Sequence, residues 1–304
     1  MNRVSLKSAM SAERPLVTPL AHDALSVRLI ERAGFRAFAI GGSAMLAARY
    51  ALPDIGLAGL GEMTDGIRDI AAASTLPFFA DGDDGYGDVK SVARTVETYE
   101  RLGVGAILIE DQRREHKQPR ADGAKGVIDF PAMEQKLRAA MDARREADTL
   151  IVGRTDAYGA LGLDAAIVRG ERFLALGADM VFIAGLKRED EYARVGRELA
   201  GARLSAAVFE GVGTPWMTPA ALGAMGFCHV SFPASLIFRA VGVMQHTLAA
   251  LRRHADGVET MNAAADSGHN RIALDNALDV ARWRRVEAEF APPADTAPIT
   301  SKPT

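Results

Sequence analysis

Carboxylates gather at the ends of two apolar segments of the chain. The segment FFADGDDGYG covers residues 78–87, and AILIEDQ covers residues 106–112. Their acids are Asp81, Asp83, Asp84, Glu110 and Asp111. Carboxylates brought close together repel one another unless hydrogen bonds or a cation compensate, and Mg²⁺ prefers such oxygen ligands. Because Asp and Gly are also common in turns, two surface turns are the alternative, but together the two clusters favour a metal site.

Eight short apolar runs recur along the chain, separated by longer segments with the apolar spacing of amphipathic helices. The runs expected to form strands are residues 16–21, 35–43, 77–83, 106–111, 149–156, 178–185, 203–210 and 229–235. The expected helices are residues 23–33, 62–75, 88–102, 131–147, 164–176, 188–200, 218–225 and 236–253. Eight such alternations predict an α/β fold, a closed (β/α)₈ barrel of the TIM type. A doubly wound sheet is the alternative, but no GxGxxG motif follows the first strand.

In a barrel of this kind, the residues that do chemistry lie at the carboxyl ends of the strands. The polar residues expected at those ends are Ser43, Asp81, Asp83, Glu110, Arg154, Asp156 and Glu210. The sequence therefore predicts that the polar chemistry of the protein gathers at one rim of the barrel.

The composition limits the class of protein. The chain has 304 residues, of which 48% are apolar and 25% are charged, so it supports a large core and is not a disordered chain. A net charge of −3 gives no general attraction to nucleic acid or to a membrane. The single cysteine, Cys228, excludes an internal disulfide. Residues 1–15 lack the apolar stretch of a signal peptide, and no run approaches a membrane span, so we expect a cytoplasmic protein.

The repeating pattern stops before the end of the chain. We expect a catalytic barrel over residues 1–255 and a helical extension over residues 256–290. Residues 291–304 are rich in Pro and Thr, a composition typical of a disordered tail.

Several of these segments together resemble the isocitrate lyase/phosphoenolpyruvate mutase superfamily. The matching stretches are AHDALSVRLIERAGFRAFAIGGS (21–43), LPDIGL (52–57), GEMT (61–64), ADGDDGYG (80–87), IEDQ (109–112), GRTDA (153–157) and LGADMVF (176–182). The resemblance implies a Mg²⁺-dependent barrel, with Mn²⁺ as a substitute, that breaks or forms a C–C or P–C bond next to a 2-oxo acid. It also implies that the eighth helix is swapped onto a partner barrel in a homodimer or homotetramer.

The same resemblance implies roles for individual residues. Those implied to hold the metal are Asp81, Asp83 and Glu110, with Asp83 nearest to it. Those implied to bind a small dicarboxylate or 2-oxo acid are Gly42, Ser43, Ala44, Arg154 and Glu210. Those implied to act in catalysis are Ser43, Asp54, His116 and Arg154. Arginine suits a planar carboxylate because it can donate two parallel hydrogen bonds.

The chain departs from the lyase pattern at its acid/base positions. Lyases of this superfamily carry a KRCGH motif whose cysteine takes part in proton transfer, and this chain has EHKQPR over residues 115–120, with Gln118 at the cysteine. Ala184 and Ala207 stand where a lyase glutamate and asparagine would be. Because decarboxylation needs no base to remove a proton, this pattern favours decarboxylation of oxaloacetate to pyruvate through a metal-stabilised enolate.

Other reactions stay open on the sequence alone. Within the same superfamily they are retro-aldol cleavage of a substituted malate or methylisocitrate, and the mutase or hydrolase chemistry of phosphonopyruvate or carboxyphosphonoenolpyruvate. Lys187 would serve a Schiff-base aldolase instead. A barrel that binds a 2-oxo acid without catalysis is a further alternative.

A charged loop follows the fourth expected strand. Residues 113–127 hold five Lys or Arg residues against two acids, together with two glycines and a proline. His116 and Lys117 in this loop are candidates for an acid or for a grip on a substrate carboxylate. Such a segment cannot bury itself, so we predict that it is mobile without substrate and closes over a bound dicarboxylate.

Overall fold

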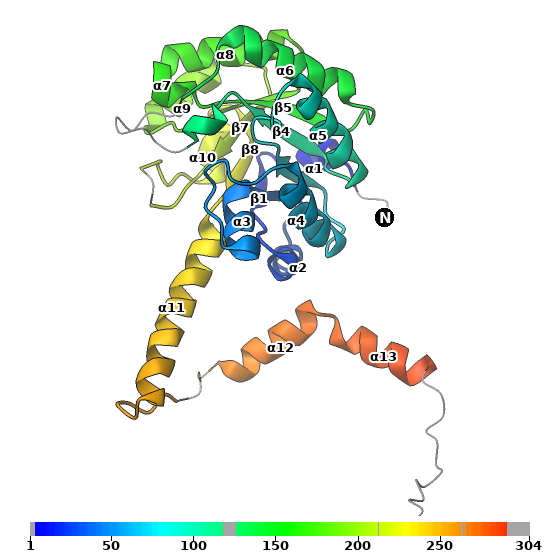
Figure 1. Ribbon diagram of the computed structural model, residues 1–304, viewed down its shortest axis with the longest axis vertical. Coiled ribbons are helices and arrows are strands. Elements are labelled where there is room, and N and C mark those ends of the chain that lie inside the picture. The colour runs from blue at the N-terminus through cyan, green and yellow to red at the C-terminus, as the bar shows by residue number, and fades with distance from the viewer. Residues whose placement is uncertain (1–3, 118–125, 212, 263, 265, 291–304) are drawn as a thin grey trace, which may run out of the picture.

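The chain folds into a barrel of eight parallel strands surrounded by helices (Figure 1). The computed structural model describes residues 4–117, 126–211, 213–262, 264 and 266–290. The strands are β1 (Leu16–Pro19), β2 (Phe38–Ile40), β3 (Phe78–Asp81), β4 (Ala106–Glu110), β5 (Leu150–Thr155), β6 (Met180–Ile183), β7 (Leu204–Ala207) and β8 (Phe227–Phe232). From β2 to β8 each strand pairs in parallel with the next, and β1 pairs with β8. An isolated parallel bridge between Leu20, just after β1, and Ala39 of β2 links the two ends of the sheet. The predicted (β/α)₈ barrel is confirmed.

The strands are apolar on both faces because each face meets a different core. Side chains such as Leu16, Phe79 and Val152 pack inside the barrel. Their alternating neighbours, including Phe78 and Ile151, pack outward against the helices. A strand buried on both sides has to be apolar throughout, which is why short continuous apolar runs identified the strands.

Eight helices match the expected ones, with somewhat different ends. They are α2 (Ala24–Arg32), α4 (Leu60–Ala72), α5 (Val89–Arg101), α6 (Phe130–Ala143), α8 (Leu163–Ala175), α9 (Glu189–Glu198), α10 (Pro219–Ala224) and α11 (Ser235–Ala255). Side chains cap the amino ends of several of these helices. At the start of α2, for example, the Asp23 carboxylate accepts a hydrogen bond from the Ser26 amide at 2.6 Å. Such caps satisfy amide groups that have no partner inside the helix.

The structure also contains elements that the apolar pattern missed. They are α1 (Leu6–Ala12), α3 (Gly42–Tyr50), the 3₁₀ helix η1 (Arg114–His116) and α7 (Ala157–Leu161). Helices α12 (Ser267–Ala277) and α13 (Val280–Phe290) lie within residues 256–290, where a helical extension was expected. The most important for the site is α3, because residues 35–43 were expected to be strand throughout. The strand ends at Ile40, and the chain turns at Gly41 into the helix-forming stretch that follows.

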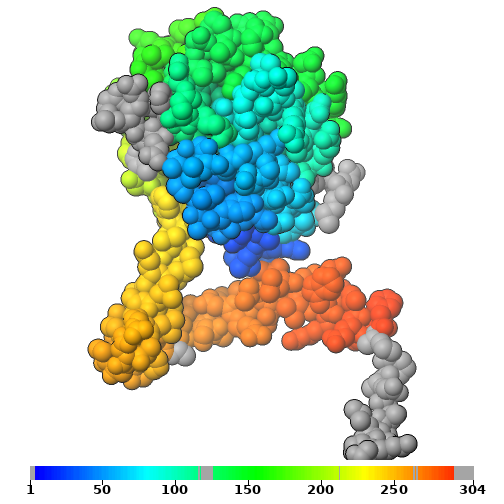
Figure 2. Space-filling model, in the orientation of Figure 1, coloured from blue at the N-terminus to red at the C-terminus, as the bar shows by residue number. Residues whose placement is uncertain are grey.

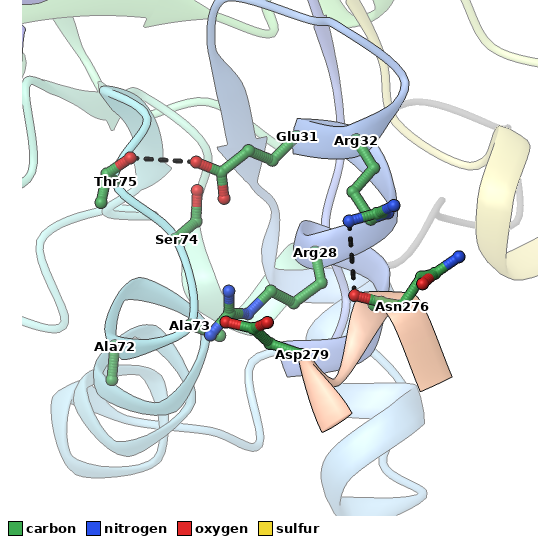
Figure 3. A pocket seen from close by; sticks show the side chains of 10 residues that line it. Arg28, Glu31, Arg32, Ala72, Ala73, Ser74, Thr75, Asn276 and Asp279 are labelled. Atoms are coloured by element: carbon green, nitrogen blue, oxygen red, sulfur yellow. Dashed lines mark hydrogen bonds between the residues drawn. The ribbon is translucent and has the colours of Figure 1, made fainter. Parts of the chain in front are cut away.

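The three C-terminal helices stand apart from the barrel. Helix α11 projects from it as a long arm (Figures 1 and 2), and none of its residues is buried. Helix α12 returns to lie near α2, where the Arg32 guanidinium donates to the Asn276 carbonyl oxygen at 3.3 Å. Figure 3 shows the hollow between these two helices, with Glu31 and Asp279 among its lining residues. Among the described residues, no helix is long and apolar enough to cross a membrane.

His229 on β8 lies inside the barrel as a neutral ring. Its Nε2 is 2.8 Å from the Thr18 hydroxyl, its Nδ1 is 2.8 Å from the Ser205 hydroxyl, and it stacks on Phe79 with ring centroids 3.9 Å apart. Burial lowers the pKa of His229 from 6.5 to about 3. The unfolded chain therefore binds more protons than the folded one between these two pH values, so acid favours unfolding.

We expect the contribution of His229 to make the unfolding free energy fall with decreasing pH below 6.5, by up to about 1.4 kcal/mol per pH unit. The variant His229→Gln removes this titration, so it should lose less stability than the wild type between pH 7.5 and pH 5. Urea unfolding at both pH values measures the two slopes. If the unfolding free energies of both proteins fall equally between the two pH values, His229 does not cause the acid sensitivity.

Candidate active site

A cavity of about 290 Å³ opens among the carboxyl ends of the strands. The predicted site residues that line it are Gly42, Ser43, Asp54, Asp81 and Arg154. They come from the start of α3, the loop after it, and the ends of β3 and β5. The structure thus brings together side chains that are more than a hundred residues apart, at the rim where the barrel fold predicts a site.

The first turn of α3 forms one side of the cavity. Gly41 caps this helix without any side-chain hydrogen bond. The amides of Gly42, Ser43 and Ala44 belong to the first turn, where no helix carbonyl is available to them. Together with the positive end of the helix dipole, such amides attract a carboxylate or an enolate oxygen. Gly42 and Ser43 line the cavity and Ala44 does not, and the substrate contacts of all three stay a prediction.

Two buried carboxylates are linked to the cavity by ion pairs, Asp83 through Lys117 to Asp54 and Glu110 to Arg154. The exposed fraction is 4% for Asp83 and 2% for Glu110. Asp83 has a φ of +47°, a left-handed conformation that is unusual for a side chain other than glycine. Burial, and then the charge of Asp81, raise the pKa of Asp83 to about 6, and burial also raises the pKa of Glu110. The cluster therefore carries more negative charge than its surroundings stabilise.

Lys117 supplies part of the missing positive charge. Its ammonium group lies 2.7 Å from Asp54 Oδ1 and also pairs with the Asp83 carboxylate. Burial alone would lower the pKa of Lys117, but the surrounding acids, led by Asp83 and Glu110, raise it above its ordinary value. Lys117 therefore holds the site's own acids together, in contrast to the expectation that it grips a substrate carboxylate.

Arg154 links the carboxylate cluster to the rest of the cavity. Its Nε and Nη2 donate to the two oxygens of Asp156 at 3.0 and 3.3 Å. Its Nη1 lies 3.0 Å from Glu110 Oε2 and 3.9 Å from Asp81 Oδ2. The guanidinium also lies over the Phe182 ring, 5.5 Å from the ring centroid. Because acids surround it on two sides, Arg154 is fixed in place and charged at the edge of the cavity.

Asp111 supports the site from behind. It is fully buried, and it accepts hydrogen bonds from the Thr155 hydroxyl at 2.6 Å and from the Asp156 amide at 2.9 Å. Arg169 lies 2.9 Å from Asp111 Oδ2 and also donates to the Ile128 carbonyl oxygen at 2.9 Å. Asp111 therefore fixes the end of β5, from which Arg154 projects, and does not face the cavity.

The arrangement fits a divalent cation held largely through water. Among the described residues, no group of three His, Cys, Asp or Glu side chains converges as a ready set of metal ligands. Mg²⁺ does not need such a set, because it keeps several waters and binds through one or two carboxylates. The unbalanced charge around Asp83 is the observation that fits a cation. Asp83, Asp81, Glu110 and Asp54 are the residues that would hold it.

Several predicted site residues do not line the cavity. Ala44, Asp83 and Glu110 lie behind the residues that line it. Glu210 lies beyond the end of β7, pairs with Arg239 of α11 and lines neither this cavity nor its neighbour. Its substrate contact stays a prediction. His116 belongs to η1, but its side chain lies outside the described part of the structure. So do residues 118–125, on which the predicted mobile lid depends.

The lining contributed by β6, β7 and β8 is uncharged. It includes the apolar Phe182, Ala207 and Phe209 together with Ser205, Ser231 and His229. Ala207 was singled out from the sequence as a replacement for a lyase asparagine, and it does line the cavity. The two phenylalanines gave no signal, because an apolar residue at a strand end looks the same in the sequence whether it faces a core or a cavity.

We expect Lys117 to compete with a divalent cation for Asp54 and Asp83. The variant Lys117→Met removes the ammonium group, so Mn²⁺ should bind at least about tenfold more tightly, which corresponds to about 1.4 kcal/mol. Titration with Mn²⁺ followed by electron paramagnetic resonance measures this affinity directly. Lys90→Met, at an exposed lysine paired with Asp88, is the matched control. Weaker Mn²⁺ binding in Lys117→Met would show that the lysine supports the metal site.

Comparisons with known proteins agree with this geometry. Residues 6–252 match the phosphoenolpyruvate phosphomutase family. The chain is 32% identical to 2,3-dimethylmalate lyase of Eubacterium barkeri over 94% of this chain and 97% of the relative. It is 35% identical to oxaloacetate decarboxylase of Bradyrhizobium sp. over 62% of this chain and 65% of the relative.

Solved structures show the same architecture. Oxaloacetate acetylhydrolase in complex with 3,3-difluorooxalacetate superimposes with a TM-score of 0.86 and 28% identity, covering 95% of this chain and 97% of that one. Phosphonopyruvate hydrolase in complex with oxalate and Mg²⁺ gives a TM-score of 0.77 and 26% identity, covering 94% and 97%. The chain belongs to the phosphoenolpyruvate phosphomutase family of the isocitrate lyase/phosphoenolpyruvate mutase superfamily of enzymes, as its motifs indicated.

Proposed function

We propose that this enzyme is a Mg²⁺-dependent carbon–carbon lyase that decarboxylates oxaloacetate, or a related 2-oxo dicarboxylate, to pyruvate or its homologue. The observation that carries the proposal is the asymmetry of the cavity. The carboxylates and Arg154 lie near the ends of β3 and β5, whereas the lining residues from β6 to β8 and the segment after β7 include Phe182, Ala207 and Phe209 together with Ser205, Ser231 and His229. None of these is a carboxylate or a lysine, and both ring nitrogens of the buried, neutral His229 are hydrogen-bonded, to Thr18 and to Ser205. This part of the lining therefore offers no free acid or base, and decarboxylation is the reaction in this superfamily that needs neither.

Each residue of the site would have its own role in the reaction. The amides of Gly42 and Ser43 would hold the oxygens of the 2-oxo acid, and Arg154 would orient the carboxylate that leaves. The bond from C3 to that carboxylate breaks, CO₂ departs, and the electron pair left on C3 forms the enolate. A proton from water then completes the 2-oxo acid. The apolar side chains of the lining limit the access of other water to the site.

The metal would supply electrostatic stabilisation of the charge that develops on the enolate oxygen. Asp83, Asp81, Glu110 and Asp54 would hold it. The Mg²⁺ recorded with the related phosphonopyruvate hydrolase supports this choice of ion, and Mn²⁺ has the same preference for oxygen ligands.

Release of pyruvate from oxaloacetate in the presence of Mg²⁺ tests the proposal. We expect turnover that EDTA abolishes and that Mg²⁺ or Mn²⁺ restores. The same assay with 2,3-dimethylmalate, 2-methylisocitrate and phosphonopyruvate tests the other reactions of the superfamily. A higher kcat/KM for any of these three would replace decarboxylation as the assigned reaction.

A Schiff-base mechanism has little support in the structure. Lys187 is exposed and lies at the rim of a neighbouring cavity, outside the one lined by Asp54 and Asp81. We expect Lys187→Met to keep most of its activity on oxaloacetate. Trapping of a substrate adduct on Lys187 by borohydride, detected by mass spectrometry, would revive this mechanism.

We also propose that the enzyme forms an oligomer through α11. The large apolar residues exposed on this helix are Leu236, Phe238, Val241, Val243, Met244, Leu248 and Leu251. A groove of about 820 Å³ between α2, α3 and the base of α11 is lined by Leu25, Leu29 and other apolar residues. A second copy of α11 would cover both surfaces, as in the helix swap that the resemblance implies.

Light scattering tests the oligomeric state. The wild type should be a dimer or tetramer, and the double variant Leu248→Glu/Leu251→Glu should be a monomer. A monomeric wild type would exclude the proposal.

A further inference from the structure

A second cavity adjoins the candidate active site. It has a volume of about 480 Å³ and shares Arg154, Phe182, Ala207 and Phe209 with the inner cavity. Beyond them it is bounded by Ile183 and Ala184 at the end of β6. A ligand whose carboxylate meets Arg154 therefore has open space on both sides of the guanidinium.

The wall of this outer cavity is apolar. The side chains of Phe182, Ile183, Ala184 and Ala207 are all at least nine-tenths buried, so they form a firm surface. These four residues come from the adjacent strands β6 and β7 and the turn after β6. A surface of this kind recognises hydrocarbon by excluding water from it.

Two hydroxyls beside the wall are already engaged, and the exposed Lys187 lies at the rim of this cavity. The Tyr158 hydroxyl donates to Glu191 Oε1 at 2.9 Å, and the Thr214 hydroxyl donates to the Phe209 carbonyl oxygen at 2.9 Å. A polar substituent entering the outer cavity would therefore lose its hydration without gaining a free partner from these two hydroxyls.

We infer that the substrate carries an apolar substituent of several carbons, which occupies the outer cavity while the 2-oxo acid end occupies the inner one. This inference rests on the proposed function and names its substrate class, an oxaloacetate substituted at C3 by an alkyl or arylalkyl group. Decarboxylation would turn such a substrate into CO₂ and a 2-oxo acid with a longer apolar chain. Unsubstituted oxaloacetate would leave the outer cavity empty.

Binding of the product series tests the inference without any need for turnover. Pyruvate, 2-oxobutanoate, 2-oxopentanoate and 2-oxohexanoate are titrated into the enzyme with Mg²⁺ and, separately, with EDTA, using calorimetry. Each buried methylene should tighten binding by about fourfold. Equal or falling affinity along the series would overturn the inference.

A variant that fills the outer cavity gives the second readout. Ala184 lines the outer cavity and not the inner one. Ala184→Leu should abolish the increase in binding affinity with chain length and leave the affinity for pyruvate unchanged. Ala220→Leu, at an exposed position on α10, is the matched control and should keep the gain. If Ala184→Leu does not fold, Ala184→Val makes a smaller intrusion, and undiminished gain in the folded variant would overturn the inference.

The two proposals fail in different ways. If pyruvate binds only with Mg²⁺ but longer acids bind no better, the proposed function survives and the apolar substituent is excluded. If no 2-oxo acid binds in a Mg²⁺-dependent way, the proposed function fails, and the inference falls with it.

Discussion

Replacement of Asp83 by asparagine is expected to lower kcat/KM about 10³-fold and to raise thermal stability at the same time. The loss follows because Asp83 is a buried acid among those that would hold the metal, paired with Lys117 beside Asp54, and a bound metal stabilises developing charge by several kcal/mol. The gain in stability follows from the cost of its buried charge. The rise in the pKa of Asp83 from 3.8 to about 6 corresponds to on the order of 3 kcal/mol.

The sign of the stability effect depends on pH. The folded protein binds more protons at Asp83 than the unfolded chain does between pH 3.8 and about 6, so this group destabilises the fold above that window. Asp83→Asn should therefore raise the melting temperature of the metal-free enzyme at pH 7.5 and have little effect at pH 3.5.

Asp65→Asn is the matched control for this experiment. Asp65 is exposed and pairs with Arg68 on the same helix, so its loss should change neither activity nor stability appreciably. The measurements are steady-state kinetics on oxaloacetate and thermal unfolding with and without Mg²⁺. If Asp83→Asn lost stability and kept its activity, Asp83 would be a structural residue and the metal would have to bind elsewhere.

The barrel could be predicted because its signal is local and repeated. A strand buried on both faces has to be apolar, and eight such runs alternate with helical spacing. The ends of the elements were less certain. Strand β2 stops at Ile40, Gly41 continues in an extended conformation as the helix cap, and the stretch after it favours a helix. A helix as short as α3 shows no clear apolar period, so the sequence pattern does not distinguish it from the strand that precedes it.

The site could be predicted in part for the same reason. The residues at the true strand ends, such as Asp81 and Arg154, line the cavity. Glu210 was expected at the end of the seventh strand, but β7 stops at Ala207 and the Glu210 carboxylate pairs with Arg239. The pairing of Lys117 with Asp83 could not be read from the sequence, because it depends on how a loop folds back over another strand.

The largest stability effect is expected from Arg169→Met, at about 3–5 kcal/mol of unfolding free energy. Arg169 is 9% exposed, and its partner Asp111 is fully buried. Burial already raises the pKa of Asp111, and Arg169 is one of the groups that offset this. The variant leaves a buried carboxylate without its counter-charge, although the Thr155 hydroxyl and the Asp156 amide still donate to it.

This effect should be specific to a buried pair. Arg138→Met removes a partner of Glu134 on an exposed helix face, and it should cost no more than about 0.5 kcal/mol. Urea unfolding of both variants compares the two costs. Because Asp111 also fixes Asp156, which holds Arg154, Arg169→Met should lower kcat/KM even where the protein remains folded. Similar small losses of stability in both variants would show that the Arg169–Asp111 pair contributes no more than a surface pair.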